Sequence, residues 1–167
     1  FDKAGNLHGQ TERRLSEVEE IDLRGYFSQI NRQNRAQAEA SIMSASGIDG
    51  SGEVAMNSDP LDLKKQFGYR FRFKADDYVD FGVVGGMTLP NPPGGKSFRT
   101  LYTTTPAPDN ETPFYCSAQR YDETYRLQLP ANVPIIAIPQ DRQFRNAAGD
   151  YRVAWRRDGQ QVIVNHR

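Results

Sequence analysis

The residues of this sequence best suited to nucleophilic or metal chemistry are one cysteine and two histidines. Cys116 follows an aromatic pair, in a setting typical of a buried thiol, and a thiol nucleophile would need a base within hydrogen-bond reach. His8 and His166 stand near opposite ends of the chain and could adjoin only if the first and last strands paired. A single cysteine excludes an internal disulfide and any multi-thiolate zinc site. We therefore predict a structural thiol, no catalytic residues, no metal site and no cofactor.

Two groups of aspartates could hold a hard cation such as calcium, which takes oxygen ligands. These groups are Asp59 with Asp62, and Asp76 and Asp77 with Asp80. Neither completes a calcium-loop pattern, and Asp76 and Asp77 suit a turn between two strands, where aspartates satisfy backbone groups. Carboxylates could also perform glycoside hydrolysis, which needs two acids about 5 to 10 Å apart. With 21 acids in the chain, the sequence selects no pair.

Aromatic and basic side chains of the second half are candidates for binding. Exposed aromatics stack on sugar rings or anchor a peptide, whereas at alternating strand positions they are more often core. The candidate binding residues are Tyr102, Tyr115, Tyr121, Trp155, Arg152 and Arg156. Together with Arg157, the last two are expected on the solvent side of a strand, opposite its apolar face. A carbohydrate-binding module is therefore one alternative function.

Composition and charge limit the partners. Lys plus Arg and Asp plus Glu both number 21, so no net field attracts nucleic acid or an anionic membrane. No run approaches the roughly 20 apolar residues of a spanning helix, and the first ten residues lack a signal peptide's apolar stretch. We predict no nucleic-acid partner and no membrane contact. The start at Phe1, without methionine, suggests a fragment of a longer chain.

The first 50 residues predict an edge strand and a helical segment. Residues 7–15 suit a polar edge strand, and Ser16 with Glu19 resembles a capping box that opens a helix near 17–31. Its apolar face would comprise Ile21, Leu23, Phe27 and Ile30. A second helical stretch would begin after Asn34 and end at Gly47. Its apolar face is thin, which indicates a surface position.

From residue 51 onward, large apolar residues recur at every second position. Tyr69, Phe71 and Phe73 alternate with basic residues, and further strands are predicted at 78–84, 98–103, 121–129 and 133–138. A last hairpin would turn at Asp158-Gly159 through a type I′ turn. We predict a mostly β, single domain spanning 1–167. Residues 1–50 would supply an edge strand and helices, and 51–167 an antiparallel, β-sandwich-like region.

Four stretches resemble the C-terminal β domain of bacterial exported transglutaminase-like proteins that carry flanking domains of unknown function. They are D-x-x-G-N-L-x-G at 2–9, LRGYF at 23–27, YRLQLP at 125–130 and NAAGDYRVAWRRDGQQVIV at 146–164. The resemblance implies a catalytic core with a cysteine, histidine and aspartate triad before Phe1, and further strands after Arg167. It also implies a periplasmic or otherwise exported protein.

These observations favour a non-catalytic accessory or interaction domain attached to a transglutaminase-like, cysteine protease-like core of the bacterial envelope. Its partner would be that upstream domain or another envelope protein. The alternatives are a carbohydrate-binding module and a carboxylate-dependent glycan hydrolase. The oligomeric state is left open by the sequence.

Overall fold

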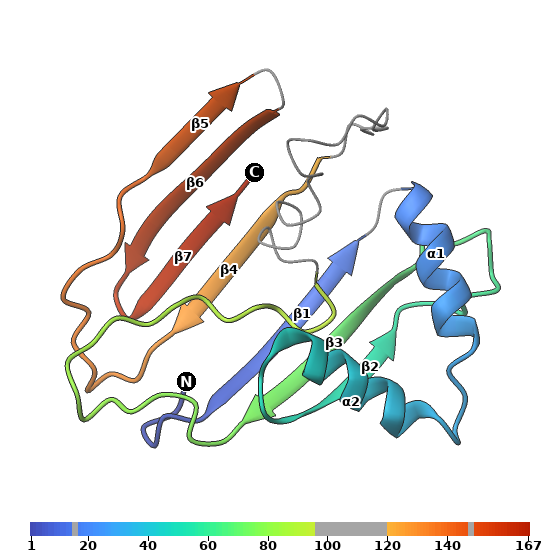
Figure 1. The fold of residues 1–167 in the computed structure, drawn as a ribbon, viewed down its shortest axis with the longest axis horizontal. Coiled ribbons are helices and arrows are strands. Elements are labelled where there is room, and N and C mark those ends of the chain that lie inside the picture. The colour runs from blue at the N-terminus through green and yellow to red at the C-terminus, as the bar shows by residue number, and fades with distance from the viewer. Residues whose placement is uncertain (15–16, 96–119, 147–148) are drawn as a thin grey trace, which may run out of the picture. The chain divides into compact units, whose positions relative to one another are not determined.

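The computed structural model describes residues 1–14, 17–95, 120–146 and 149–167, in two compact units (Figure 1). The N-terminal unit is Ala4–Thr105, and the C-terminal unit combines Pro106–Arg167 with Phe1–Lys3. Both units are built on antiparallel sheets, which confirms a mostly β protein. The stacking of two sheets as a sandwich, and a single domain, stay predictions. No helix in the described ranges is long and apolar enough to cross a membrane.

The N-terminal unit contains a three-stranded sheet in the order β1-β3-β2, and two helices. Its strands are β1 (Leu7–Arg14), β2 (Ser51–Met56) and β3 (Gly68–Ala75). The period of two in β3 is confirmed, because Tyr69 and Phe71 are buried while Arg70 and Arg72 are exposed. The edge strand predicted at 7–15 is β1, and its partner β3 lies beyond residue 50. The sheet therefore crosses the boundary at residue 50 that the sequence suggested.

The core of this unit lies between the aromatic face of β3 and helix α1 (Glu17–Ser28). The ring of Phe27 lies 4.7 Å from that of Tyr69 and 5.5 Å from that of Phe67, measured between centroids. Phe71 covers a glycine of the neighbouring strand, since a β-carbon at Gly52 would lie 2.3 Å from its ring. Large rings on the central strand thus fill the space that glycines leave on its neighbours.

Helix α1 presents a different face from the one predicted. Phe27 is buried as expected, but Ile21 is 71% exposed. The residues that face the sheet are Glu20, Arg24 and Phe27, which share one side of a helix by their spacing. The buried face of α1 therefore contains Arg24, whereas the hydrophobic pattern predicted that it would contain Ile21.

Helix α2 (Arg35–Ser46) covers the outer edge of β2. Glu39 accepts a hydrogen bond from the backbone N–H of Val54 at 2.9 Å, and Arg35 donates to the carbonyl of the same residue. The helix ends at Gly47, whose φ of 71° is left-handed, as predicted. Asn34 stands at the N-cap without a side-chain cap bond. The ion pair on α2 thus takes the place of a fourth strand.

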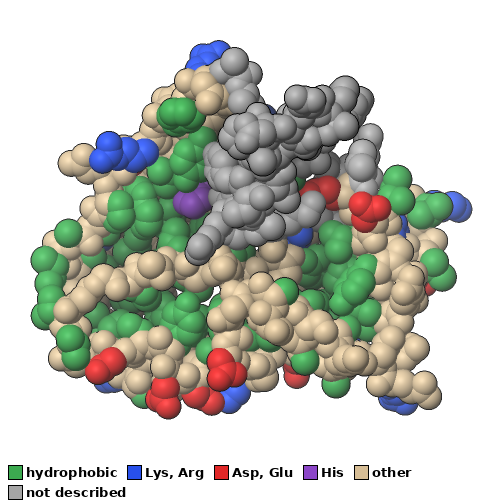
Figure 2. Space-filling view, viewed as in Figure 1, with side chains coloured by type: hydrophobic (Ala, Val, Ile, Leu, Met, Phe, Trp, Pro, Cys, Tyr) green, Lys and Arg blue, Asp and Glu red, His purple; other side chains and the backbone are tan. Residues whose placement is uncertain are grey.

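The C-terminal unit contains a four-stranded sheet in the order β4-β7-β6-β5. Its strands are β4 (Glu123–Gln128), β5 (Arg142–Asn146), β6 (Gly149–Asp158) and β7 (Gln161–His166). Val153, Val162 and Val164 are buried on one face. Figure 2 shows hydrophobic side chains gathered over this sheet. The strand predicted at 121–129 and the final hairpin are confirmed, whereas β5, whose residues are all exposed, had no apolar signal.

Two predicted strands are absent from the described parts of the chain. Residues 78–84 are not a strand, because β1 and β2 already occupy both sides of β3, and Val83 and Val84 are 69% and 85% exposed. Residues 133–138 are not a strand either, and Ile136 is 77% exposed. Prolines at 134 and 139 remove N–H donors that a sheet ladder would need. The strand predicted at 98–103 lies outside the described residues.

The turn of the final hairpin differs from the predicted one both in its residues and in its type. Asp158 pairs with Gln161, so the two turn residues are Gly159 and Gln160. Gly159 has a φ of +58°, while Gln160 does not have a positive φ. A positive φ at the first turn residue alone is the pattern of type II′ and not of type I′. The prediction of type I′ was wrong because Asp158 stays in the ladder of β6.

Replacing Gly159 by alanine should destabilise the hairpin through the backbone alone. A β-carbon there meets no atom within 4 Å, but the φ of +58° is strained for any residue with a side chain. We expect a loss of about 1–2 kcal/mol in the free energy of unfolding. The fluorescence of Trp155, the single tryptophan, measures this in a urea titration. Gly149→Ala, which also meets open space but at an ordinary φ, is the control and should change stability by less than about 0.5 kcal/mol.

Candidate functional site

The four predicted binding residues that the structure describes do not form one site. Tyr102 and Tyr115 lie outside the described residues, as does Cys116. Trp155 is half-buried, and its register partner Val164 places it on the apolar face of the sheet. The exposed Arg152 and Arg156 alternate with it and lie on the opposite face, as predicted. Tyr121 precedes β4 and is partly exposed.

Arg157 lies on the same face of β6 as Trp155, and not on the face of Arg152 and Arg156. Its register partner is the buried Val162, so it lies on the apolar face of β6 and not on the opposite face as predicted, although the residue is exposed to solvent. Its guanidinium donates hydrogen bonds to the carbonyls of Gly159 at 3.0 Å and Ile135 at 2.8 Å. This arginine ties the turn and the segment before β5 together, which is a structural role.

The two histidines belong to strands that do not pair with each other. His8 is in β1, next to β3, whereas His166 is in β7, between β4 and β6. The ring of His166 packs against Tyr125 and Tyr151, with centroids 5.6 and 6.0 Å away. Burial lowers the pKa of His166, which keeps it neutral at neutral pH. Within the described ranges, no three His, Cys, Asp or Glu residues gather as a metal site would require.

The aspartates flagged as possible cation ligands bond to backbone groups of their own loops. Asp59 accepts from the N–H of Leu61 at 2.8 Å, and Asp62 from the N–H of Lys64 at 3.1 Å. The turn predicted at Asp76 and Asp77 is confirmed, with a φ of +52° at Asp77, although no hairpin follows it. These carboxylates shape turns, as short polar side chains often do.

The connection between β2 and β3, residues 57–67, is a compact loop that we call the leucine loop. Its two ends are tied together: the N–H of Asn57 donates to the carbonyl of Gly68 at 3.0 Å, and the N–H of Gly68 donates to the side-chain oxygen of Asn57 at 2.8 Å. In Figure 1 this loop lies beside α1. Loops of this length with closed ends are frequently functional.

Arg24 holds the leucine loop in shape from within. This residue is 8% exposed, and one terminal nitrogen, Nη1, donates to the carbonyls of Pro60 at 2.8 Å and Asp62 at 3.2 Å. The other, Nη2, donates to the carbonyl of Lys65. The guanidinium carbon lies 5.3 Å from the centroid of the Phe67 ring, within the range of a cation–π contact. Arginine suits this position because its five N–H groups diverge in one plane.

Glu20 is the ionic partner of Arg24, and we call these two residues together the clamp. Its Oε1 accepts hydrogen bonds from Arg24 Nε and from the N–H of Phe67, both at 2.9 Å. The bond from the Phe67 backbone, followed by that from Arg24, lowers the pKa of the Glu20 carboxyl. Glu20 therefore stays ionised at neutral pH, and the buried arginine keeps its counter-ion.

The clamped loop directs two leucine side chains into solvent. Leu61 is 75% exposed and Leu63 82%, and Ile21, one turn before Arg24 on α1, is 71% exposed. The carbonyls on either side of Leu61 are held by Arg24, so the backbone faces inward while the side chains face outward. Figure 2 shows hydrophobic side chains reaching the surface where α1 and this loop lie. Large contiguous patches of exposed apolar side chains often mark interaction sites on other proteins.

Sequence reasoning missed this site, although a signal for it is present. The loop reads Asp59-Pro60-Leu61-Asp62-Leu63, which places two leucines in a turn composition where neither helical nor strand periodicity would bury them. An arginine on the buried side of α1 is the second signal, since buried charges need partners.

Two cavities of the N-terminal unit, of about 200 and 320 Å³, bear on the glycan hydrolase alternative. Among the described residues that line them, the first contains one carboxylate, Glu12, and the second contains none. The described lining of neither cavity contains the two acids that glycoside hydrolysis requires. Comparison with protein-family models, with curated proteins and with solved structures found no match to this chain. The resemblance to transglutaminase-like proteins therefore stays a prediction.

Proposed function

We propose that this chain is a non-catalytic protein-interaction domain whose binding surface includes the leucine loop and Ile21. The observation that carries this proposal is the ordered exposure of Leu61 and Leu63 at 75% and 82%. Arg24 loses its hydration on burial, and its guanidinium holds the backbone carbonyls of Pro60 and Asp62, next to these side chains. A loop that served only to connect β2 with β3 would gain nothing from displaying two leucines.

The energetics of this surface suit protein binding. Full burial of a leucine side chain contributes about 1.5–3 kcal/mol, so the two leucines together could change a dissociation constant by about 10²- to 10⁴-fold. Because the clamp fixes the loop backbone before a partner arrives, little conformational entropy is lost on binding. The loop therefore has the apolar area and the pre-organisation of an anchor.

The resemblance supports a place for this domain beside a transglutaminase-like core of the bacterial envelope, in an exported protein. On this proposal the partner is that core or another envelope protein, and the domain itself performs no chemistry. Hydrolysis or cross-linking of peptides by the purified chain would refute the non-catalytic part of the proposal.

A photo-activated cross-linking residue at position 61 or 63, introduced in the native host, tests the binding surface. We expect adducts to one protein from both positions, identified by mass spectrometry. The same residue at position 84 is the matched control, since Val84 is 85% exposed in the same unit but lies outside the leucine loop. Equal adducts from position 84, or none from 61 and 63, would contradict the assignment.

The double substitution Leu61→Ser with Leu63→Ser should separate binding from stability. We expect affinity for the cross-linked protein to fall by about 100-fold, measured by calorimetry. The free energy of unfolding should change by less than about 0.5 kcal/mol, because both side chains already face water. Val83→Ser with Val84→Ser should leave both quantities unchanged. A large loss of stability in the leucine variant would show that these residues serve the fold.

A further inference from the structure

One face of the four-stranded sheet in the C-terminal unit is open to solvent. It lies opposite the buried valines, and the exposed side chains of Arg126, Arg152 and Arg156 project from it. Residues 106–167 contain eight arginines and no lysine. Arginine differs from lysine by a planar fork that binds a carboxylate or a phosphate through two parallel hydrogen bonds. The cations of this face therefore suit oxyanions that accept two hydrogen bonds at once.

Arg152 lies directly opposite another arginine. Its backbone N–H donates to the carbonyl of Arg167 at 2.8 Å, and the N–H of Arg167 donates to the carbonyl of Arg152 at 2.9 Å, so the two side chains share a face. Like charges directly opposite each other destabilise a sheet. The nearby carboxylate of Asp122 is shared, since it lies 3.5 Å from Arg167 Nε and 2.8 Å from Arg120 Nε. A bound anion would relieve this repulsion.

Arg126 and Arg156 flank Ile163 on the two strands beside β7. No described residue accepts a hydrogen bond from the guanidinium of Arg126 or Arg152. Arg156 Nη2 lies 3.8 Å from a carboxylate oxygen of Asp158, beyond hydrogen-bond distance. Arg152 and Arg156 are four residues apart on β6, or about 13 Å, and Arg126 and Arg156 are two strand spacings apart, or about 9.5 Å. We call the set formed by Arg126, Arg152, Arg156 and Arg167 the arginine face.

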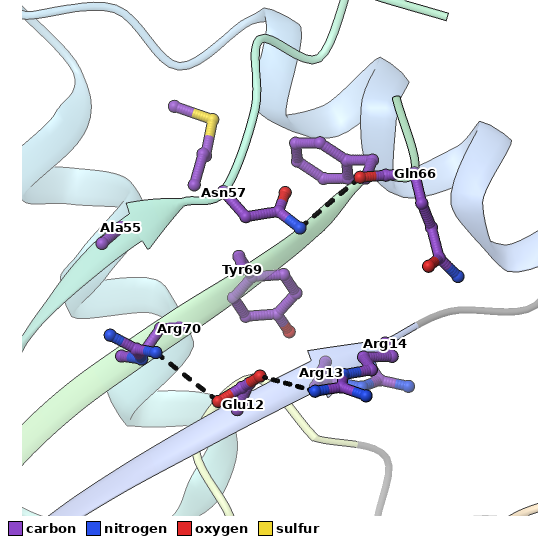
Figure 3. Close-up of a pocket in the computed structure, with 10 residues that line it drawn as sticks. Glu12, Arg13, Arg14, Ala55, Asn57, Gln66, Tyr69 and Arg70 are labelled. Carbon is purple, nitrogen blue, oxygen red and sulfur yellow. Dashed lines mark hydrogen bonds and ion pairs between the residues drawn. The ribbon is translucent and has the colours of Figure 1, made fainter. Parts of the chain in front are cut away.

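The outer face of the three-stranded sheet differs, because its arginines have acids opposite them. Arg70 lies opposite Glu12, and Arg72 lies opposite Glu53. The dashed lines in Figure 3 join Glu12 to Arg70 and to Arg14, at 3.6 Å in each case. Cross-strand pairs of opposite charge stabilise a sheet. The cations of that face therefore serve the fold, whereas the corresponding neighbours on the arginine face are another arginine and Ile163.

The remaining side chains of this face suit sugar hydroxyls. Amide and hydroxyl side chains, which both donate and accept hydrogen bonds, lie among the arginines at Thr124, Gln128, Gln143, Gln161 and Asn165. The aromatic residues of the four strands all lie on the opposite face, at Tyr125, Phe144, Tyr151 and Trp155. Single-stranded nucleic acid stacks its bases on aromatic side chains, and protein hot spots are rich in Trp and Tyr. The arginine face therefore matches an anion that also presents many hydroxyls.

We propose that the arginine face binds an acidic polysaccharide whose sugar units carry carboxylates. The arginine forks bind the carboxylates, and the amides among them bind hydroxyls. The spacing of the arginines requires an extended ligand of several sugar units. Since Trp155 lies on the other face, this mode differs from the stacking of sugars on aromatic rings. The inference concerns the C-terminal unit and does not depend on the leucine loop having a partner.

The direct test is a titration of the ¹⁵N-labelled chain with a short oligogalacturonate, followed by the backbone amide signals of Arg126, Arg156 and Asn165. We expect a dissociation constant on the order of 0.1–1 mM, because each exposed charge pair contributes little. The fully methyl-esterified oligomer has the same sugar chain without charge and should bind at least about 10-fold more weakly. Equal binding of the two oligomers would overturn the proposal. Tighter binding of poly-glutamate or of single-stranded DNA, at equal charge, would refute a polysaccharide site.

The double variant Arg126→Gln with Arg156→Gln locates the site. We expect oligogalacturonate to bind about 10-fold more weakly to it than to the parent chain. Arg70→Gln with Arg72→Gln is the matched control, because it removes the same charge from the outer face of the three-stranded sheet. Its dissociation constant should stay within about twofold of the parent value. Equal losses in the two double variants would refute a site at the arginine face.

Arg152→Gln separates a binding role from a structural one. It removes the like charge opposite Arg167, so the midpoint of urea denaturation should stay the same or rise, while oligogalacturonate binds about 3-fold more weakly. A lower midpoint, or unchanged binding, would show that Arg152 serves the fold and would contradict its place in the site.

Discussion

Replacing Arg24 by methionine is expected to lower the free energy of unfolding of the N-terminal unit by about 2–4 kcal/mol. Methionine keeps much of the apolar volume but leaves the carbonyls of Pro60, Asp62 and Lys65 without their donor. It also leaves Glu20 with the N–H of Phe67 as its remaining partner from the clamp. Urea denaturation followed by the amide signals of β3 measures the change. The amides of the leucine loop should also exchange with solvent much faster than in the unchanged protein.

Arg32→Met is the control for this experiment, because Arg32 is exposed between the two helices. Its stability should stay within about 0.5 kcal/mol of the parent. The pH dependence supplies a second readout. Since the folded-state pKa of Glu20 lies below its ordinary value of 4.5, its contribution is complete above pH 4.5 and is lost as the pH falls towards the lowered pKa. Arg24→Met should weaken this acid-dependent loss, and an unchanged profile would contradict the clamp.

Phe71→Ala is expected to destabilise the same unit by about 3–5 kcal/mol. Phe71 is fully buried on the central strand. Its ring covers Gly52, which has no side chain to move into the space that the substitution would leave. The cavity would therefore remain open, and the cost should lie near the upper end of the range. Urea denaturation followed by far-ultraviolet circular dichroism measures it.

Arg72→Ala, one residue along the same strand, is the matched control. Its side chain lies on the exposed face of β3, so we expect a change of less than about 0.5 kcal/mol. If the two alanine variants were equally stable, the aromatic face of β3 would not be the core of this unit.

Local features of the sequence predicted those parts of the fold that depend on local spacing. The alternation in β3 and in the final hairpin was correct, because a strand with one buried face must place apolar residues at every second position. The end of α2 at Gly47 was also correct, since a left-handed residue there favours glycine. The strands 78–84 and 133–138 had suitable residues, but in the structure neither is paired with a neighbouring strand.

The candidate site depended much less on such patterns. Of the described residues first selected for binding or metal chemistry, only Asp59 and Asp62 lie in the leucine loop, as turn-forming residues. The loop emerged from the bonds of Arg24, which join residues more than 30 positions apart. This relation is not visible in a single sequence.

The sequence by itself therefore determined that this protein is mostly β, where helix α2 ends, and which side chains alternate in β3 and in the final hairpin. Those properties follow from backbone geometry and from the burial of apolar area, both of which act over a few residues. Only the tertiary structure decided which strands pair, that Arg24 and not Ile21 faces inward, and that Leu61 and Leu63 remain in solvent. The reason is that distant segments compete for the same sheet edges and backbone carbonyls, and the outcome of that competition is set by the whole chain.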